Sequence, residues 1–205
     1  MQPCPIYIGP HQLQLTTNGY VYHLYFPPSY PPTPFSKWLH TQSPWIAQVE
    51  LLLYTNTKGE IDELCLDDWQ VIGRRDPLWS QLQTKEEMRD MRGIGRKFLA
   101  LCLKDMVQRK GLSVDLRFTL QAVGGDWDRI KWETIPSEIE AQQQLKRYTC
   151  GKSQYGDRPY GTLLGLCQQN EKLVDYYQSL GFITTTPLST HVNMETTIKQ
   201  LLHPT

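Results

Sequence analysis

Apolar and polar positions recur at two different periods along the chain, which predicts strands interrupted by helices. The stretch "YVYHLYF" (residues 20–26) is rich in β-branched and aromatic side chains and is typical of a strand. The stretches "WIAQVELLLYTN" (45–56) and "GEIDELCLDDWQV" (59–71) predict two more strands. A polar turn that contains glycine, "TNTKGE" (55–60), joins these two as an antiparallel hairpin.

The second strand of this hairpin presents two different faces. Because side chains alternate along a strand, Ile61, Glu63 and Cys65 share one face. Leu64 and Leu66 share the other face with Asp62. The strand therefore carries a carboxylate and a thiol on one side and aliphatic side chains on the other.

Helical spacing dominates the stretch "GIGRKFLALCLKDMVQRKG" (93–111). Its apolar positions repeat every three or four residues from Ile94, which predicts a helix that ends in basic residues followed by Gly111. Upstream, Thr84 and Glu87 lie three residues apart and predict a capping box that opens a short helix.

A later helix is predicted over "NEKLVDYYQSL" (170–180), with Gly181 at its end. One face of this helix carries Leu173, Tyr176, Tyr177 and Leu180. The stretches "LSVDLRFTL", "GTLLGLC", "FITTT" and "HVNMETTI" predict further strands. We expect a single mixed α/β domain over residues 1–205, with insertions at about 67–89 and 119–160.

The segment "PPSYPPTP" (27–34) interrupts this pattern. Proline lacks a backbone donor and fixes φ, so the segment is predicted to be an extended loop or polyproline II helix. A surface or active-site loop is favoured over a proline-rich ligand for another domain.

Charge and composition exclude several classes of protein. Lysine plus arginine and aspartate plus glutamate both number 21, so no global field attracts nucleic acid or an anionic membrane. No apolar run approaches the roughly 20 residues of a membrane helix, and the start of the chain lacks the features of a signal peptide. The five cysteines form no disulfide or zinc pattern. We expect a soluble cytoplasmic protein, a monomer or homodimer, with no metal.

The stretch "MRGIGRK" (91–97) is suited to bind phosphate. Glycines where a helix begins leave backbone N–H groups open to an anion, and the helix dipole and the adjacent basic side chains favour negative charge. A tight turn with solvated basic residues remains the alternative. The stretch matches neither the GxGxxG nor the GxxxxGK[ST] motif.

Taken in order, these stretches resemble the GNAT acetyltransferase superfamily over roughly residues 46–200. The stretch "RGIGRKFLALCL" is similar to its pyrophosphate-binding loop and helix, and "NEKLVDYYQSLGF" is similar to its helix that begins at asparagine and ends in Tyr-x-x-Leu-Gly-Phe. The resemblance implies a mixed, mostly antiparallel sheet with two splayed parallel strands and flanking helices. It also implies acetyl-CoA or a related acyl-CoA as donor and a primary amine, in a small molecule or protein, as acceptor.

The resemblance also implies residue roles. Cys65 and Leu66 would bind the pantetheine arm through their main chain, and Asn170 would meet the same arm. The pyrophosphate would lie on the loop residues Arg92, Gly93, Ile94, Gly95, Arg96 and Lys97. Tyr177 would protonate the leaving thiolate, which leaves Tyr176 as a core or wall residue.

An amine must lose a proton before it attacks, so a general base is useful. Glu63 is the first choice, and Asp62, Glu50 and His191 are alternatives because a one-residue bulge would exchange the faces of the strand. A solvated strand carboxylate is the competing interpretation of Glu63. Asp67, Asp68 and Trp69 are read as residues after the strand, where they would attract a cationic acceptor or be solvated loop charges.

Two departures from the family leave other functions open. Asp90 stands where the family has glutamine or arginine, and the long segment before it is read as an inserted lid or partner element. One alternative is an acyl-CoA-binding or interaction module without turnover. Another is a nucleotide-binding protein that uses the same glycine loop.

Overall fold

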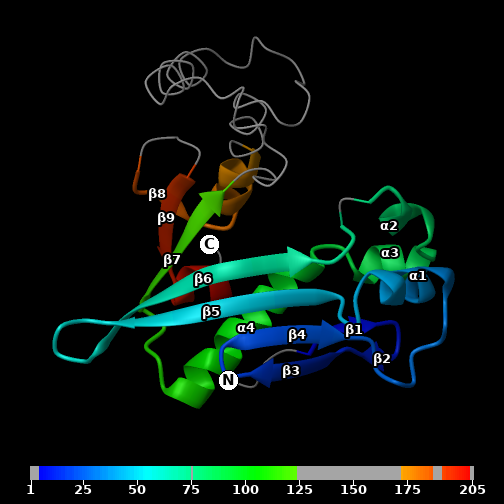
Figure 1. The fold of residues 1–205 in the computed structure, drawn as a ribbon, viewed down its shortest axis with the longest axis horizontal. Helices are drawn as coiled ribbons and strands as arrows, with labels where there is room; N and C mark the ends of the chain where they lie inside the picture. Colours follow the sequence, from blue (N-terminus) through cyan, green and yellow to red (C-terminus); the bar gives the residue numbers. More distant parts are fainter. Residues whose placement is uncertain (1–4, 75, 124–171, 187–190, 204–205) are drawn as a thin grey trace, which may run out of the picture. The chain divides into compact units, whose positions relative to one another are not determined.

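The computed structural model describes residues 5–74, 76–123, 172–186 and 191–203. Its contacts divide the chain into two compact units, Met1–Leu116 and Arg117–Thr205, and each unit is described by itself. Both units contain antiparallel strands and helices, which confirms a mixed α+β protein with mostly antiparallel sheet (Figure 1). The single-domain organisation stays a prediction.

Four antiparallel strands form the sheet of the first unit. In order they are β3 (Gln14–Asn18), β4 (Val21–Tyr25), β5 (Ala47–Thr55) and β6 (Ile61–Val71). The predicted hairpin of β5 and β6 is confirmed, and its turn closes through the bond from the Asn56 N–H to the Glu60 carbonyl.

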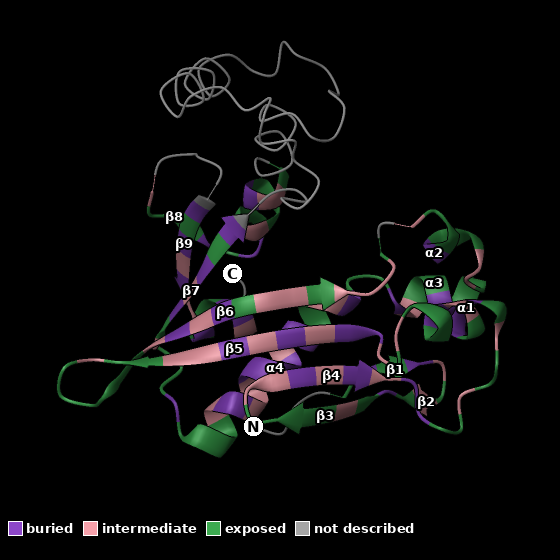
Figure 2. Cartoon of the chain, viewed as in Figure 1, coloured by how far each residue is buried: buried purple, intermediate pink, exposed green. Residues whose placement is uncertain are grey.

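Helix α4 (Ile94–Lys110) covers one face of this sheet and confirms the helix predicted from Ile94. Phe98, Cys102 and Met106 are fully buried on α4, as expected from their helical spacing. Burial alternates along β5 (Figure 2). Leu51 on β5 and Leu64 on β6 are both fully buried. The helix ends at Gly111, whose φ of 64° is left-handed.

A β-bulge interrupts β6 at Asp67. Leu51 pairs with Leu66 and Glu50 pairs with Asp68, so Asp67 has no partner across the ladder. The extra residue shifts the alternation and brings Trp69 to the same face as Leu66. The strand therefore continues through Asp67–Val71, and the segment that follows it begins later than we predicted.

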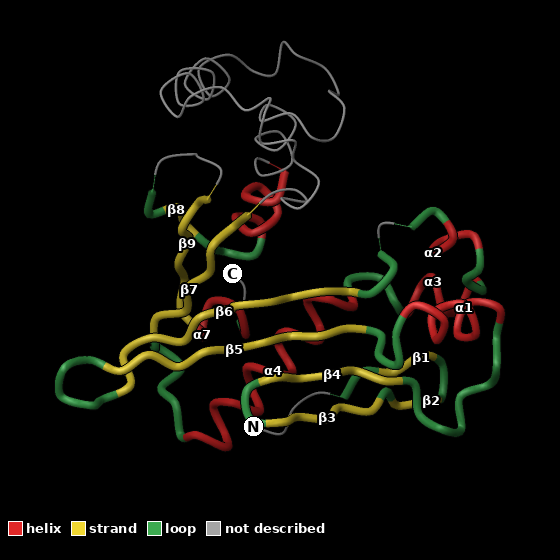
Figure 3. Tube along the Cα trace, in the orientation of Figure 1, coloured by secondary structure: helices red, strands yellow, loops and turns green. Residues whose placement is uncertain are grey.

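Three short helices lie together beyond one end of the strands of this sheet (Figure 3). Helix α3 (Lys85–Asp90) begins with the predicted capping box of Thr84 and Glu87. Helices α1 (Pro34–Gln42) and α2 (Leu78–Gln81) were not predicted. The signal for α1 is the Thr33-Pro34 pair, because the Thr33 side chain accepts from the Ser36 N–H and proline suits the first helical turn.

Residues 27–33 of the proline-rich segment form a loop, as predicted, whereas Pro34 begins α1. Buried Glu87 holds this loop against α3. The Glu87 carboxylate accepts hydrogen bonds from the Tyr30 hydroxyl at 2.8 Å and the Thr33 hydroxyl at 2.6 Å. The same carboxylate accepts from the Thr84 N–H at 2.7 Å. A buried carboxylate with three donors is fully satisfied, so these bonds fix the loop in place.

In the second unit, β9 (His191–Thr197) lies between β7 (Arg117–Val123) and β8 (Ile183–Thr184), and both pairings are antiparallel. β7 includes residues 119–123, so the strand takes up the start of the predicted insertion. The stretch 161–167, predicted as a strand, lies outside the described residues. Helix α7 (Ile198–Leu202) was not predicted, although Thr197 and Gln200 form a capping box.

Residues 172–179 form the helix predicted from the Tyr-Tyr stretch. Within the described ranges, no helix is both long enough and apolar enough to cross a bilayer.

Candidate functional site at the start of helix α4

Gly93 precedes α4 in the left-handed conformation, with a φ of 68° and a ψ of 21°. A Cβ atom at this position would meet nothing within 4 Å, so space does not require glycine. The backbone conformation requires glycine, because the left-handed region is energetically unfavourable for residues that carry a Cβ atom. The glycine therefore provides the left-handed residue of the turn that joins α3 to α4.

The first turn of α4 has open donors. The Ile94 N–H bonds the Met91 carbonyl at 3.0 Å, and the Lys97 N–H bonds the Gly93 carbonyl at 3.1 Å. Between these two, no described residue accepts a hydrogen bond from the N–H of Gly95 or Arg96. Arg92 and Arg96 are exposed beside these amides. Open amides, the helix dipole and two guanidinium groups together favour an anion such as a phosphate.

Gly95 has a second, structural reason to be glycine. A Cβ atom there would lie 3.2 Å from Cζ2 of Trp69 and 3.2 Å from Cγ2 of Val71. The start of α4 thus lies directly on β6, at the part of the strand that follows the bulge. The two predicted glycines are brought together with Arg92, Ile94, Arg96 and Lys97 in one turn, but each glycine serves a different purpose.

Asp90 is committed to contacts within the protein. Its carboxylate accepts from the Gly9 N–H at 2.8 Å and from the Arg89 Nε at 2.7 Å. The hydrogen bond from Arg89 and the bond from Gly9 lower the pKa of Asp90 to about 2. The Asp90 carbonyl accepts from the Lys97 ammonium at 3.0 Å. Asp90 thereby joins the N-terminal turn between β1 (Tyr7–Ile8) and β2 (His11–Gln12) to the glycine loop.

The predicted base lies toward the other end of β6. Glu63 pairs with Tyr54 near the hairpin turn, whereas α4 begins against Val71. At about 3.3 Å per residue, Glu63 and Val71 are about 26 Å apart along the strand. Between them, Cys65 is half-buried on the Glu63 face and Leu66 is buried on the α4 face, as their alternation predicts.

Asp68 lies within β6, as the strand predicted over residues 59–71 requires, and its placement after the strand was wrong. Its carboxylate accepts from the Gln48 amide at 2.9 Å and from the Gln70 amide at 2.9 Å. Gln48 in turn bonds His23 at 3.1 Å, and the His23 ring lies 4.4 Å from that of Trp45. The sequence analysis missed this row of polar side chains from Asp68 to His23. Which of these side chains become neighbours depends on the bulge and on the register between the strands, so the alternation of side chains within each strand is the only signal for the row.

Tyr177 takes part in ending its own helix. The Phe182 N–H bonds the Tyr177 carbonyl at 3.2 Å, and the Gly181 N–H bonds the Gln178 carbonyl at 2.9 Å. Gly181 has a φ of 99°, which completes a Schellman motif. The rings of Tyr177 and Phe182 lie 5.7 Å apart and form the hydrophobic contact of this motif. The Tyr-x-x-Leu-Gly-Phe pattern thus has a structural explanation in the way this helix ends.

Tyr176 is not a core residue, which corrects the predicted face of this helix. It is 43% exposed, whereas Val174 and Leu180 are buried. The buried stripe therefore includes position 174 and leaves position 176 toward solvent. Val174, Tyr177 and Leu180 follow one another at intervals of three residues and therefore lie on the same face of the helix.

Other predicted site residues are not brought together by what the structure describes. Asn170 lies outside the described residues, and so does the side chain of His191. Tyr177 belongs to the second unit, whereas Glu63 and the glycine loop belong to the first. Asp62 is exposed, and Glu50 pairs with Asp68 across the bulge. In the described ranges, no group of three His, Cys, Asp or Glu side chains is placed to hold a metal ion.

Comparison with known proteins finds no family model, no curated protein and no solved structure that matches this chain.

Proposed function

We propose that the protein is an acyl-CoA-dependent N-acyltransferase that acetylates a primary amine. The observation that carries the proposal is the glycine loop, where Gly93 opens the first turn of α4 and the N–H groups of Gly95 and Arg96 remain available. Arg92 and Arg96 add positive charge beside these amides. This arrangement fits a diphosphate better than a neutral ligand.

The order of elements supports the same proposal. A bulged strand, β6, is followed by the short helices α2 and α3, then by the glycine loop and α4, β7, a helix over residues 172–179 and the antiparallel pair β8 and β9. Apart from α2 and α3, which lie in the long segment before the loop, this order agrees with that expected from the GNAT resemblance. In the proposal, the main chain of Cys65 and Leu66 and the side chain of Asn170 hold the pantetheine arm.

Bound acyl-CoA would supply an activated acyl group as a thioester. The protein's own part is to handle protons. Glu63 accepts a proton from the ammonium form of the acceptor, directly or through water, so that the nitrogen lone pair can attack the carbonyl carbon. As the C–N bond forms and the C–S bond breaks, the Tyr177 hydroxyl would donate its proton to the departing sulfur, and the second proton of the attacking nitrogen would return to the Tyr177 phenolate through water.

The proposal is tested in two stages with the full chain. Calorimetry should show binding of acetyl-CoA, with affinity reduced about tenfold or more in Arg92→Ala/Arg96→Ala through loss of charge-assisted bonds. The exposed Lys37→Ala variant serves as control. A thiol-release assay with a panel of amines then measures turnover. Absence of acetyl-CoA binding would reject the proposal at the first stage.

A binding module without turnover is the second candidate, and the engagement of Asp90 favours it. The carboxylate that replaces the family's glutamine or arginine is used for Gly9 and Arg89 and offers no donor to phosphate. Acetyl-CoA binding without thiol release from any amine would support this candidate. Equal affinity for ATP or NAD would instead indicate a nucleotide-binding protein.

A further inference from the structure

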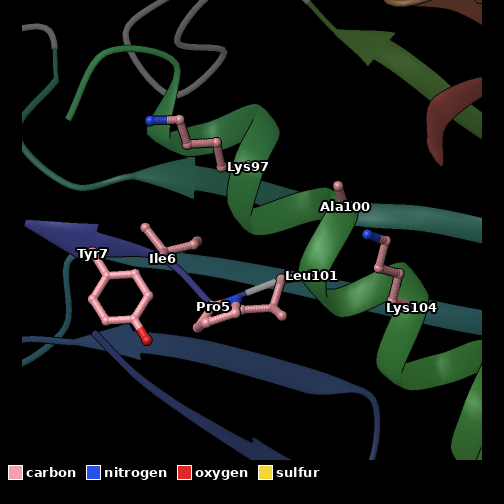
Figure 4. A pocket seen from close by; sticks show the side chains of 7 residues that line it. All are labelled: Pro5, Ile6, Tyr7, Lys97, Ala100, Leu101 and Lys104. Atoms are coloured by element: carbon pink, nitrogen blue, oxygen red, sulfur yellow. The ribbon is translucent and has the colours of Figure 1, made fainter. Parts of the chain in front are cut away.

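A cavity of about 350 Å³ lies between the N-terminal segment and the outer face of α4, within the first unit (Figure 4). Ile6 and Leu101 supply apolar surface to it and are 5% and 7% exposed. Tyr7 contributes an aromatic ring from the N-terminal side. Its size lies at the lower end of the range for small-molecule sites.

Two lysines are the charged residues of this cavity. Lys97 and Lys104 lie seven residues apart on α4, about 10 Å along the helix axis, with Ala100 between them. Among the described residues, the lining contains no carboxylate. Apolar walls with ammonium groups and no acid give the cavity the character of a receptor for an amphipathic anion.

The two lysines differ in what they already bind. The Lys97 ammonium donates to the Asp90 carbonyl at 3.0 Å. Lys104 is half-buried, and in the part of the chain that the structure describes its ammonium makes no hydrogen bond or ion pair. A lysine that is withdrawn from solvent usually has a partner, so Lys104 is the position where an anionic group would gain most.

The helix offers Lys104 no acid of its own. The positions three and four residues away on either side are Leu101, Ala100, Val107 and Gln108. The adjacent Asp105 is engaged elsewhere, because its Oδ2 accepts from the Tyr22 hydroxyl and from the Arg109 guanidinium. Asp105 and Arg109 thus bind each other and do not pair with Lys104.

We propose that this cavity binds a small carboxylate with a hydrocarbon body. The carboxylate pairs with the Lys104 ammonium, and the hydrocarbon lies on Ile6, Ala100 and Leu101. The site shares Lys97 with the loop assigned to the pyrophosphate, but it uses none of the loop amides and does not depend on the proposed acyl transfer.

The test uses 4-phenylbutyrate as the probe and the uncharged 4-phenylbutyramide as its matched control, with acetate as an anion that lacks the apolar body. Amide shifts in ¹H–¹⁵N correlation spectra of the full chain are followed during titration. We expect saturable shifts at Ile6, Ala100 and Leu101 with the acid, at millimolar affinity. The amide and acetate should each bind at least about tenfold more weakly, since each lacks one half of the interaction.

Two variants locate the site. Lys104→Met removes the charge and keeps the apolar stem, and should weaken 4-phenylbutyrate about tenfold without changing the affinity for the amide. Ala100→Phe should fill the cavity and abolish binding of both. Lys37→Met, on α1, is the control for general loss of charge.

Three outcomes would overturn the proposal. One is the absence of saturable shifts with 4-phenylbutyrate at its highest soluble concentration. Another is equal affinity for the acid and the amide, which would remove the role of Lys104. A third is unchanged binding in both Lys104→Met and Ala100→Phe, with the fold of each variant checked by its own spectrum, because binding would then occur elsewhere.

Discussion

The carboxylate of Asp90 accepts a hydrogen bond from the backbone N–H of Gly9, 81 residues earlier, at 2.8 Å. This bond joins the N-terminal turn to the last residue of α3, next to the glycine loop. Gly9 is left-handed with a φ of 57°, and a Cβ atom there would lie 2.7 Å from Oε1 of Glu86. The exposed Glu86 carboxylate can move away from such an atom, so the left-handed φ is the reason for glycine at this turn.

Asp90→Asn should lower the free energy of unfolding at pH 7 by about 1 kcal/mol, because the amide cannot stabilise Arg89 by charge and accepts more weakly from Gly9. The pKa of Asp90 is lowered to about 2, whereas an unfolded aspartate titrates near about 3.9. The contribution of the Asp90 charge to the free energy of unfolding is therefore complete above about pH 4 and is lost as the pH falls through 2. Urea unfolding at several pH values measures this.

The difference between wild type and Asp90→Asn should thus shrink between about pH 4 and pH 2. Asp62→Asn, an exposed carboxylate on β6, is the control and should show no such convergence. A difference that is constant over this pH range would contradict the role assigned to the Asp90 charge.

Gly93→Ala should destabilise the protein by about 1–2 kcal/mol, since alanine pays to adopt a left-handed φ. No neighbour lies within 4 Å of the added Cβ, so the cost is one of backbone conformation alone. Gly93→Asn should recover part of the loss, because asparagine tolerates this region better than alanine. Equal stability of the alanine and asparagine variants in thermal unfolding would argue against this origin.

Gly95→Ala tests the packing of α4 on β6. Alanine gains about 1 kcal/mol of helix propensity, but its Cβ would lie 3.2 Å from side-chain atoms of Trp69 and Val71. In a double-mutant cycle, Val71→Ala should make Gly95→Ala more favourable by at least about 0.5 kcal/mol. Additive effects would contradict the contact. The pair Gly95→Ala and Val107→Ala, which are far apart on α4, should be additive.

Tyr177→Phe separates the two roles of this residue. The ring contact with Phe182 remains, so the free energy of unfolding should change by less than about 1 kcal/mol. If Tyr177 is the proposed acid, turnover should fall about 10²-fold while acetyl-CoA affinity is kept. Tyr176→Phe, at an exposed position, should change neither quantity. Full turnover by Tyr177→Phe across the pH range would limit Tyr177 to a structural role.

Local patterns accounted for much of the fold. The β5 and β6 hairpin, α4 with its Gly111 end and the Thr84 capping box follow from short-range chemistry. The position of the bulge at Asp67 could not be predicted from the sequence, because the pairing with β5 decides which residue of β6 is left without a partner. For the same reason, the bond between Asp90 and Gly9 and the row from Asp68 to His23 were missed.

The candidate site was predictable to a smaller extent. Glycines before a helix signal an open first turn, and this part of the prediction agrees with the structure at Gly93. The sequence did not reveal that Gly95 is also required by the Trp69 ring, since that contact joins separate elements. Nor did it show that Tyr176 faces solvent, because two adjacent tyrosines fit either side of the apolar stripe.

The bulge gives β6 two frames of alternation in one strand. Leu64 and Leu66 face the core in the first frame, and Trp69 and Val71 face it in the second. Deletion of Asp67 alone would merge the frames and turn the indole away from Gly95, even though no core residue had been replaced. The spacing of this strand, as much as its composition, is therefore what seats α4 and keeps the glycine loop where it is.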